Sequence, residues 1–504
     1  MVLIIGMAAC GKKHDNDVNE NVYRDWNVDF SEDPTTITYL TIGDKPTNGM
    51  TEAAVEEINK LLLKKVNAKL DIFYVSWNDY LNKYNQILSD GDVDIDLVAT
   101  STDWLDAWAN AQKGYFLPMS REMLKTFCPM TYQNVTSEEW TKCSYEGAVY
   151  FIPENEYTQW TNHGFIYRED IAREAGIGTI QNWDDLNRYL KYIARHRNEM
   201  VPWDSDGTNT TFTLGYLMSA GKYRPIYELS TYGIWGMYED DGKIVSPYYE
   251  GNDFLQFAKL MKEWNMLGVW RSDQSEVGDN TEEFYQGYSG LIQHHTNKYF
   301  TETKPKMVIR NPSTELGFYW FGEECGNLMK TSILHGGMAV YAGSKNPEKA
   351  LMVYDVLRND KECYRLIRYG REGVQYTVTK DGRQKKLEGY NSDRDEILTN
   401  FWWGRRDELE LLDSDVAWDE YYELLNTYEH VEIEYPWDGY DFAYGINERK
   451  LESVIQVCDK YIPEISYARY NISPEAEVAL FRNELKDAGI EDVTREIQKI
   501  VNSH

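Results

Sequence analysis

Apolar and polar positions follow a regular order over residues 35–112. Ile37 and Tyr39 alternate with threonines, a pattern that predicts a strand over 35–42. Apolar residues at helical spacing then predict a helix over 51–65. The two patterns recur as a strand at 70–74, a helix at 80–88, a strand at 95–98 and a helix at 104–112. This β-α-β-α-β order implies a parallel sheet with helices on both faces, and such sheets bind ligands at the carboxyl ends of their strands.

A second unit with similar patterns begins after residue 153. The sequence predicts a strand at 165–167, helices at 168–176, 183–196 and 252–266, and an apolar run at 333–342. Asn346-Pro347-Glu348 and Ser473-Pro474-Glu475 each combine a capping residue, a proline at the first helical position and an acid in the first turn. Both therefore predict helix starts.

The excess of acidic residues argues against nucleic acid and anionic membranes as binding partners. The chain has 504 residues, with 52 Lys and Arg against 83 Asp and Glu, and a net charge of −31. Nonspecific binding to nucleic acid or to an anionic membrane surface depends on Lys and Arg, so neither is an expected partner. Aromatic residues make up 14% of the chain. Tyr and Trp present flat apolar faces with a polar edge, which suits ligands that are both apolar and hydroxylated.

The N-terminal residues are typical of a secretory segment. An apolar run, Val2 to Met7, leads into Ala8, Ala9 and Cys10. The string resembles the end of a bacterial lipoprotein signal, in which two small residues precede a lipidated Cys. The basic start is missing, so residues 1–10 are interpreted as a truncated signal, and the polar, acidic residues 11–34 as a disordered tether. The alternative is an apolar N-terminal strand that contains a Cys by chance.

The other cysteines and the acidic turns give little support for a metal or a cofactor, and we expect neither. No CxxC pair and no Cys/His cluster with zinc spacing is present. Cys128 and Cys143 either form a disulfide or stay as buried thiols. The acidic strings at 90–96 and 204–207 are interpreted as turns, because they lack the spaced downstream ligands of a calcium loop.

Four strings in order indicate a family. They are Asp96-Leu97-Val98 with Trp104 and 113–119; 147–153 with 167–170, 176–177 and 182–186; 284–292; and 335–350 with 369–374. Together they resemble the extracellular solute-binding proteins of bacterial ABC importers, in particular the large lipoprotein-type sugar binders of Gram-positive bacteria. No single string is specific, but their order and spacing over residues 35–375 are.

The resemblance implies an α/β fold with two lobes of the periplasmic-binding-protein type (type II), a hinge, and a ligand cleft between the lobes. It implies lobe 1 at 35–152 with a return segment at about 307–368, lobe 2 at 153–306 with about 369–460, and C-terminal helices at 461–504. The chain is expected to cross between lobes near Ile152–Gly164, Met307 and Tyr369.

The function that the resemblance implies is capture of a solute, a carbohydrate or oligosaccharide, and its delivery to the permease of an ABC transporter. We expect a monomer on the extracellular face of the membrane, held by lipid on Cys10, without catalysis. The alternatives are a glycoside hydrolase, binding of a peptide or other small solute, and an adhesin. Hydrolysis needs two carboxylates at a set distance, which a sequence does not show. No G-x-S-x-G, HExxH or P-loop string occurs.

The ligand residues are expected on loops that follow the strands and on the segment between lobes. The candidates are Trp77, Asp103, Trp104, Glu154, Tyr157, Trp160, Tyr232, Trp235 and His294, with His295 beside it. Trp160 and Asp103 are the preferred aromatic and acid. Each has a structural alternative: the aromatics as core, Asp103 as a helix cap, and the histidines as solvated or hydrogen-bonded structure. Trp402-Trp403 is interpreted as packing between lobes.

Overall fold

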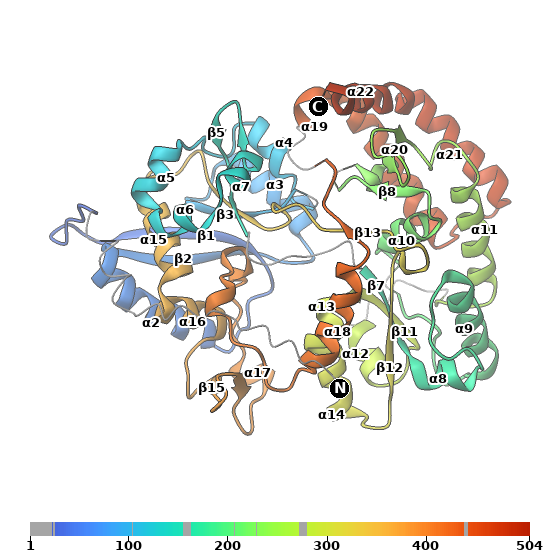
Figure 1. Ribbon diagram of the computed structural model, residues 1–504, viewed down its shortest axis with the longest axis horizontal. Helices are drawn as coiled ribbons and strands as arrows, with labels where there is room; N and C mark the ends of the chain where they lie inside the picture. Colours follow the sequence, from blue (N-terminus) through green and yellow to red (C-terminus); the bar gives the residue numbers. More distant parts are fainter. Residues whose placement is uncertain are drawn as a thin grey trace, which may run out of the picture.

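The computed structural model describes residues 23, 26–102, 104–154, 163–205, 207–227, 229–271, 280–437 and 442–503. Two lobes lie side by side, and helices of the C-terminal end cover the outer side of the second (Figure 1). Each lobe has its own buried apolar cluster. The expected two-lobe α/β architecture is confirmed.

Lobe 1 is built on a five-stranded sheet in the order β2-β1-β3-β14-β6. β1 (Thr35–Ile42), β2 (Ala68–Val75) and β3 (Leu97–Thr100) run parallel, and β14 (Gly337–Val340) pairs antiparallel with β3 and with β6 (Ile152–Pro153). The connecting helices are α2 (Met50–Val66), α3 (Tyr80–Asp90) and α4 (Ala107–Gln112). The predicted β-α-β-α-β order is confirmed. The last helix begins at Ala107 rather than 104, because Asp106 has the left-handed φ of 51°.

Lobe 1 contains further helices and 3₁₀ turns. They are α5 (Arg121–Phe127), α6 (Pro129–Asn134), α7 (Ser137–Lys142), α15 (Pro347–Asn359), α16 (Lys361–Tyr369), α17 (Ser392–Asp395) and the 3₁₀ turns η5 (Phe401–Gly404) and η6 (Asp407–Leu409). The short hairpins β4 (Ser144–Tyr145) with β5 (Ala148–Val149) and β15 (Tyr376–Val378) with β16 (Gln384–Lys386) complete the lobe. The predicted helix start at Asn346 is confirmed.

Lobe 2 is organised around an antiparallel sheet, β11-β7-β12, made of β7 (His163–Arg168), β11 (Leu291–His295) and β12 (Leu316–Trp320). A second sheet contains β8 (Tyr223–Pro225), β9 (Trp235–Met237) and β10 (Ile244–Val245). The predicted strand at 165–167 and helices at 168–176, 183–196 and 252–266 are confirmed as β7, α8 (Glu169–Glu174), α9 (Trp183–His196) and α11 (Asp253–Met266).

Lobe 2 contains further helices, turns and two short strands. They are α10 (Thr211–Ser219), η2 (Ser230–Tyr232), α12 (Asn280–Tyr285), α13 (Thr296–Lys298), η3 (Tyr299–Thr303), α14 (Lys304–Arg310), η4 (Glu323–Cys325), β13 (Leu328–Met329), α18 (Trp418–Glu429) and β17 (Glu432–Ile433). β13 and β17 pair in parallel, which joins two segments about a hundred residues apart in the chain.

Two of the three expected crossing points are displaced along the chain. The first crossing falls between β6 and β7, where it was expected. The second lies after Met329 instead of near Met307, because β12 hydrogen-bonds to β7 and so keeps residues 316–320 in lobe 2. The third lies after Ser414 instead of near Tyr369, because the backbone groups of Leu412 and Ser414 still hydrogen-bond to Gln384 of β16, whereas Val416 belongs to a buried cluster with residues of lobe 2.

The described part of the expected tether is packed on lobe 1. Trp26 is 9% exposed, and its indole Nε1 donates to the carbonyl oxygen of Thr126 over 2.7 Å. Asn67 Nδ2 donates to the carbonyl oxygens of Asp29 and Glu32. The prediction of a disordered tether is therefore wrong for residues 26–34, because an aromatic anchor offsets the cost of ordering this polar stretch. Cys10 lies outside the described residues.

The C-terminal unit begins earlier than the expected residue 461. It comprises α19 (Phe442–Gly445), α20 (Glu448–Ser466), α21 (Pro474–Ala488) and α22 (Ile490–Ser503). The predicted start at Ser473 is confirmed, since its hydroxyl accepts from the backbone N–H of Ala476 over 3.2 Å. Cys128 and Cys143 are buried free thiols.

Candidate ligand site between the lobes

The carboxyl ends of β1, β2 and β3 form the edge of the lobe 1 sheet where loops leave it. Because these three strands are parallel, the loops after Ile42, Val75 and Thr100 emerge along the same edge. Trp77 follows β2 and Trp104 follows β3. The turn η5 contributes Trp402 and Trp403, and Trp403 Nε1 donates to the carbonyl oxygen of Thr100 over 3.0 Å.

These four indoles form what we call the tryptophan row. Trp77 and Trp104 are stacked with ring centroids 5.7 Å apart, and Trp104 and Trp402 are stacked at 6.4 Å. Trp402 in turn stacks on Trp403 at 3.8 Å. Trp77 is 46% exposed, whereas Trp403 is fully buried. The row thus runs from the core of lobe 1 to an accessible end, where an indole face is open to a ligand.

A buried carboxylic acid marks the point where the chain leaves lobe 1. Glu154 follows β6 and is 4% exposed, and its Oε1 has no hydrogen-bond partner in the described part of the chain. Burial raises the pKa of Glu154 to about 8, although the positive charges of His335 and Arg405 act in the opposite direction. The group is therefore held in its neutral form at mildly acidic pH, in which a carboxyl both donates and accepts hydrogen bonds.

Three histidines of lobe 2 lie at the start of β7 and at the end of β11. The ring of His163 is 6.3 Å from that of His294 and 5.6 Å from that of His295. The backbone N–H of His295 donates to His294 Nδ1, and that of Lys298 donates to His295 Nδ1. Burial lowers the pKa of His294 well below its usual range and that of His295 to about 3. Both rings are neutral and carry their proton on Nε2.

The histidines face lobe 1 as well as each other. His335, which precedes β14, lowers the pKa of His295 through its charge, and its ring centroid is 6.3 Å from that of Trp402. Tyr232 of η2 also connects the lobes electrostatically: burial raises its pKa to about 12, and the next contribution is the charge of Asp106 in lobe 1. The charges of His335 and Asp106 in lobe 1 thus act on His295 and Tyr232 of lobe 2, which links these side chains electrostatically across the two lobes.

The family follows from a match that covers most of the fold just described. Residues 45–362 match the model for the bacterial extracellular solute-binding protein family. The chain belongs to this family. Residues 438–503 match a separate model, a domain of unknown function (DUF3502). The expected family is confirmed, and the protein is an extracellular solute-binding protein.

A curated relative and several solved structures resemble this solute-binding protein. A carbohydrate ABC transporter substrate-binding protein of Streptococcus pneumoniae serotype 4 is 23% identical over 404 residues, which cover 77% of this chain and 74% of the relative. The structure of the N-glycan transport solute-binding protein NgtS of Streptococcus pneumoniae, solved with Man1GlcNAc, is 19% identical and superposes with a TM-score of 0.71. The match covers 93% of this chain and 99% of the NgtS chain. The alginate-binding protein AlgQ2 is 15% identical with a TM-score of 0.66, over 94% of this chain and 99% of the AlgQ2 chain.

The structure brings some of the predicted residues of this solute-binding protein together and not others. Trp77 and Trp104 lie in one row on lobe 1, while Glu154, Tyr232 and His294 lie at the crossing or on the facing lobe. Trp235 is fully buried, and its Nε1 donates to the carbonyl oxygen of Ser230. It packs in the core of lobe 2 and not at a surface open to a ligand. Asp103, Tyr157 and Trp160 lie outside the described residues.

Sequence reasoning missed Trp402, Gly336, His163 and His335 as parts of the site. The Trp402-Trp403 pair was visible as a motif, and its interpretation as interlobe packing fails because both rings stack within lobe 1. Gly336 shows its role only in space: a β-carbon there would lie 2.2 Å from Glu154 Oε2.

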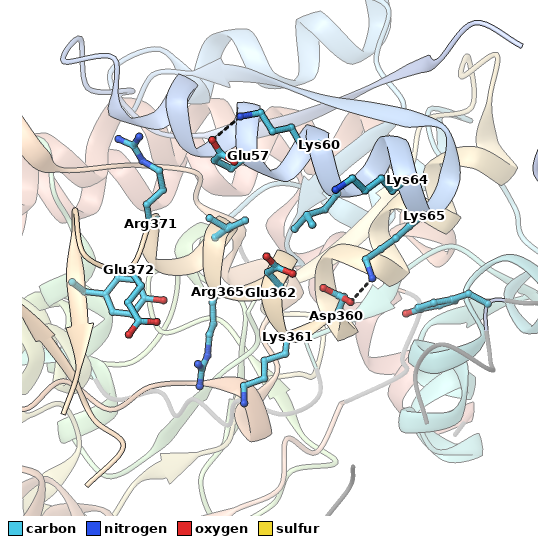
Figure 2. A pocket seen from close by; sticks show the side chains of 15 residues that line it. Glu57, Lys60, Lys64, Lys65, Asp360, Lys361, Glu362, Arg365, Arg371 and Glu372 are labelled. Carbon is cyan, nitrogen blue, oxygen red and sulfur yellow. Dashed lines mark hydrogen bonds and ion pairs between the residues drawn. The ribbon is translucent and has the colours of Figure 1, made fainter. Parts of the chain in front are cut away.

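A groove of about 1100 Å³ on the outer surface of lobe 1 is a different kind of site (Figure 2). α2 and α16 form its sides, and Lys60 pairs with Glu57 and Lys65 with Asp360. None of the predicted ligand residues lines it. Charged side chains rather than stacked indoles face this groove, so we keep the candidate solute site at the tryptophan row.

The described residues carry neither a metal cluster nor a membrane span. No group of three or more His, Cys, Asp and Glu side chains among them is placed to hold a metal ion. No described helix is both long and apolar enough to cross a bilayer.

Proposed function

We propose that this solute-binding protein captures an oligosaccharide between its lobes and delivers it to the permease of an ABC transporter. The tryptophan row carries the proposal, because its exposed end at Trp77 offers the apolar face on which a sugar ring stacks. Neutral Glu154 and the histidines supply hydrogen-bond groups for hydroxyls. The relatives support the ligand class, since they are described as carriers of carbohydrate, N-glycan and alginate.

The proposal includes the form in which the protein acts. It works as a monomer without catalysis, on the extracellular face of the membrane, held there by lipid on Cys10. Asp103, Tyr157 and Trp160 remain proposed ligand residues, together with Trp77, Trp104, Glu154, Tyr232 and His294.

A thermal-shift screen tests the function. A ligand that binds only the folded protein raises the melting temperature by mass action. The panel contains Man5GlcNAc, alginate oligosaccharides, human-milk oligosaccharides and tripeptides. We expect at least one oligosaccharide and no peptide to raise the melting temperature. A shift with peptides alone would reject the sugar assignment.

The bound sugar then decides between capture and hydrolysis. After a day at 37 °C with the protein, the saccharide is recovered and analysed by mass spectrometry. An intact saccharide supports capture, whereas shorter products that disappear in a Glu154→Gln variant would establish a hydrolase.

A further inference from the structure

The groove on the outer surface of lobe 1 collects positive charge in an acidic chain. It lies where α2 packs on α16, and its volume is about 1100 Å³ (Figure 2). Among the described residues, six cationic and four acidic side chains line it, whereas the whole chain has a net charge of −31. Two of the cations are neutralised locally, since Lys60 pairs with Glu57 and Lys65 with Asp360. The groove therefore keeps a local excess of positive charge.

The other four cations of the groove form no ion pair in the part of the chain that the structure describes. We call them the groove cations: Lys64 of α2, Lys361 and Arg365 of α16, and Arg371, which follows the end of α16 by two residues. Glu362 and Glu372, the remaining acids of the groove, are not paired with any of them. The groove cations are thus free to meet an anion from outside the protein.

Two of the groove cations lie where the local structure disfavours positive charge. Lys361 and Arg365 are four residues apart on α16, so they share one face of the helix and their like charges repel. Lys361 is also the first residue of α16, the end at which the helix dipole disfavours a cation. Figure 2 shows both side chains extending in one direction from the helix, while Glu362 points the other way. Neither charge therefore helps α16 to form.

The two arginines also lack hydrogen-bond acceptors. The Nε atoms of Arg365 and Arg371 are buried and have no hydrogen-bond partner in the described part of the chain. Arg371 Nη2 contacts the thioether of Met50 at 3.3 Å, and a thioether is a weak acceptor. A buried donor without an acceptor destabilises a fold, and a planar guanidinium matches the oxygens of an oxyanion. An oxyanion in the groove would supply the acceptors that these side chains lack.

We propose that this groove is a second binding site, in which the groove cations hold a phosphate-bearing anion. Phosphate suits them better than a carboxylate, because a phosphate group has three terminal oxygens and more negative charge to share among several cations. Negative charge beside Lys361 and Arg365 also relieves their repulsion. A groove of this size has room for a ligand with more than one phosphate group. The site does not depend on the proposed sugar site, since none of the candidate sugar ligands lines it.

Calorimetric titration with pyrophosphate tests the groove. Wild type should bind it, and a Lys361→Gln, Arg365→Gln double variant should bind at least tenfold more weakly. Lys69→Gln, Lys113→Gln is the matched control, because both lysines are exposed on lobe 1 and neither lines the groove. The control should change the affinity less than twofold. Equal affinities of wild type and the groove double variant, or an equal loss in the control, would overturn the proposal.

A vesicle arm distinguishes a soluble ligand from a lipid headgroup. Protein is sedimented with vesicles of phosphatidylcholine and cardiolipin, a lipid that carries two phosphates. We expect no capture, because the net charge of −31 opposes approach to an anionic membrane. Capture that the groove double variant loses would assign the same phosphate chemistry to a headgroup. Wild type that binds neither pyrophosphate nor these vesicles would overturn the proposal.

The fold of the groove double variant is checked by its melting temperature without ligand. This temperature should equal or exceed that of wild type, because a repelling pair on α16 has been removed. A lower melting temperature would show that the two cations stabilise lobe 1, and would overturn the proposal. Affinity for the screened saccharides should stay within twofold of wild type. If wild type binds no saccharide, the proposed function fails while the pyrophosphate titration still decides on the groove.

Discussion

The backbone N–H of Glu154 donates to the carbonyl oxygen of Gly336 over 2.9 Å, and the side chain of Glu154 fills the space beside the α-carbon of that glycine. Two segments far apart in the chain, the exit from lobe 1 and the return to it, are thereby joined at one point. The position of the buried acid depends on the absence of a side chain at 336.

Gly336→Ala should disturb the site. The new β-carbon would lie 2.2 Å from Glu154 Oε2 and 2.8 Å from the Trp402 ring, so both groups must move. We expect a loss of saccharide affinity of about tenfold or more, on the scale of a displaced binding residue. Gly337→Ala is the control, because its β-carbon would meet the nearest atom at 3.5 Å, an ordinary contact. Calorimetric titration of both variants measures the difference, and equal affinities would contradict the prediction.

The stability of the protein should depend on pH through Glu154. Its pKa is about 8 when folded and about 4.3 when unfolded. Between these values only the folded state holds the proton, so the free energy of unfolding falls as pH rises from about 4.5 to 8. In Glu154→Gln the side chain at 154 does not titrate, so it causes no such fall in the free energy of unfolding. The free energy of unfolding of the variant, measured in urea, should therefore rise relative to that of wild type by roughly 1–3 kcal/mol between pH 5 and pH 8. A difference independent of pH would show that the acid is ionised in the folded protein.

The two ends of the tryptophan row should respond differently to truncation. Trp77→Ala removes an exposed ring and should weaken saccharide binding by about 2 kcal/mol, roughly thirtyfold, while the free energy of unfolding changes by less than about 1 kcal/mol. Trp403→Ala removes a buried ring and should lower the free energy of unfolding by about 3–5 kcal/mol. Binding and unfolding are measured on both variants. The assignment of Trp77 fails if its removal leaves affinity unchanged.

His295 should make the protein sensitive to acid. Its pKa is about 3 when folded and about 6.5 when unfolded, so below pH 6.5 the unfolded state binds a proton that the folded state does not. The free energy of unfolding therefore falls as pH decreases from about 6.5 towards 3. His295→Asn keeps an acceptor for the backbone N–H of Lys298, because Asn is a good N-cap. From pH 7 to pH 5 the free energy of unfolding of His295→Asn, measured in urea, should rise by about 1–2 kcal/mol relative to that of wild type. A constant difference would argue against a buried neutral ring.

The lipid anchor is tested in a host bacterium. The full-length gene is expressed, and cell extracts are partitioned between a detergent phase and water. Wild type should enter the detergent phase, and Cys10→Ser should move to the aqueous phase, because the thiol is the proposed point of attachment. Partitioning that Cys10→Ser leaves unaltered would exclude this anchor.

Local patterns were sufficient for the elements of the first lobe. The spacing of apolar residues between Thr35 and Asp90 determines which faces are buried, and the strands and helices there follow it. The crossing points did not follow from local pattern. Residues 316–320 stay with lobe 2 only because they pair with β7, about 150 residues earlier, and no periodicity records that partner.

For single residues of the candidate site, too, local sequence was not sufficient for a prediction. Trp77 and Trp104 were accessible to prediction because they follow strands of a parallel sheet. Trp402 stacks on a ring almost 300 residues away, so its role appears only after folding. Trp235 and Trp77 have the same chemistry, yet one is fully buried and the other 46% exposed, and nothing in their neighbouring residues separates them.

Because Trp26 is docked on α5, a force applied at the N-terminal end acts on the two lobes unequally. Tyr23 stacks on Trp26 at 4.5 Å, and the indole is bonded to Thr126, so a pull on the N-terminal end enters lobe 1 first. Lobe 2 receives that load through the crossing segments and through the contact of α19 with α4. If Cys10 is held at a membrane, the thirteen residues to Tyr23 span at most about 45 Å. Lobe 1 is then the stationary body, and lobe 2, with the C-terminal unit, does the swinging.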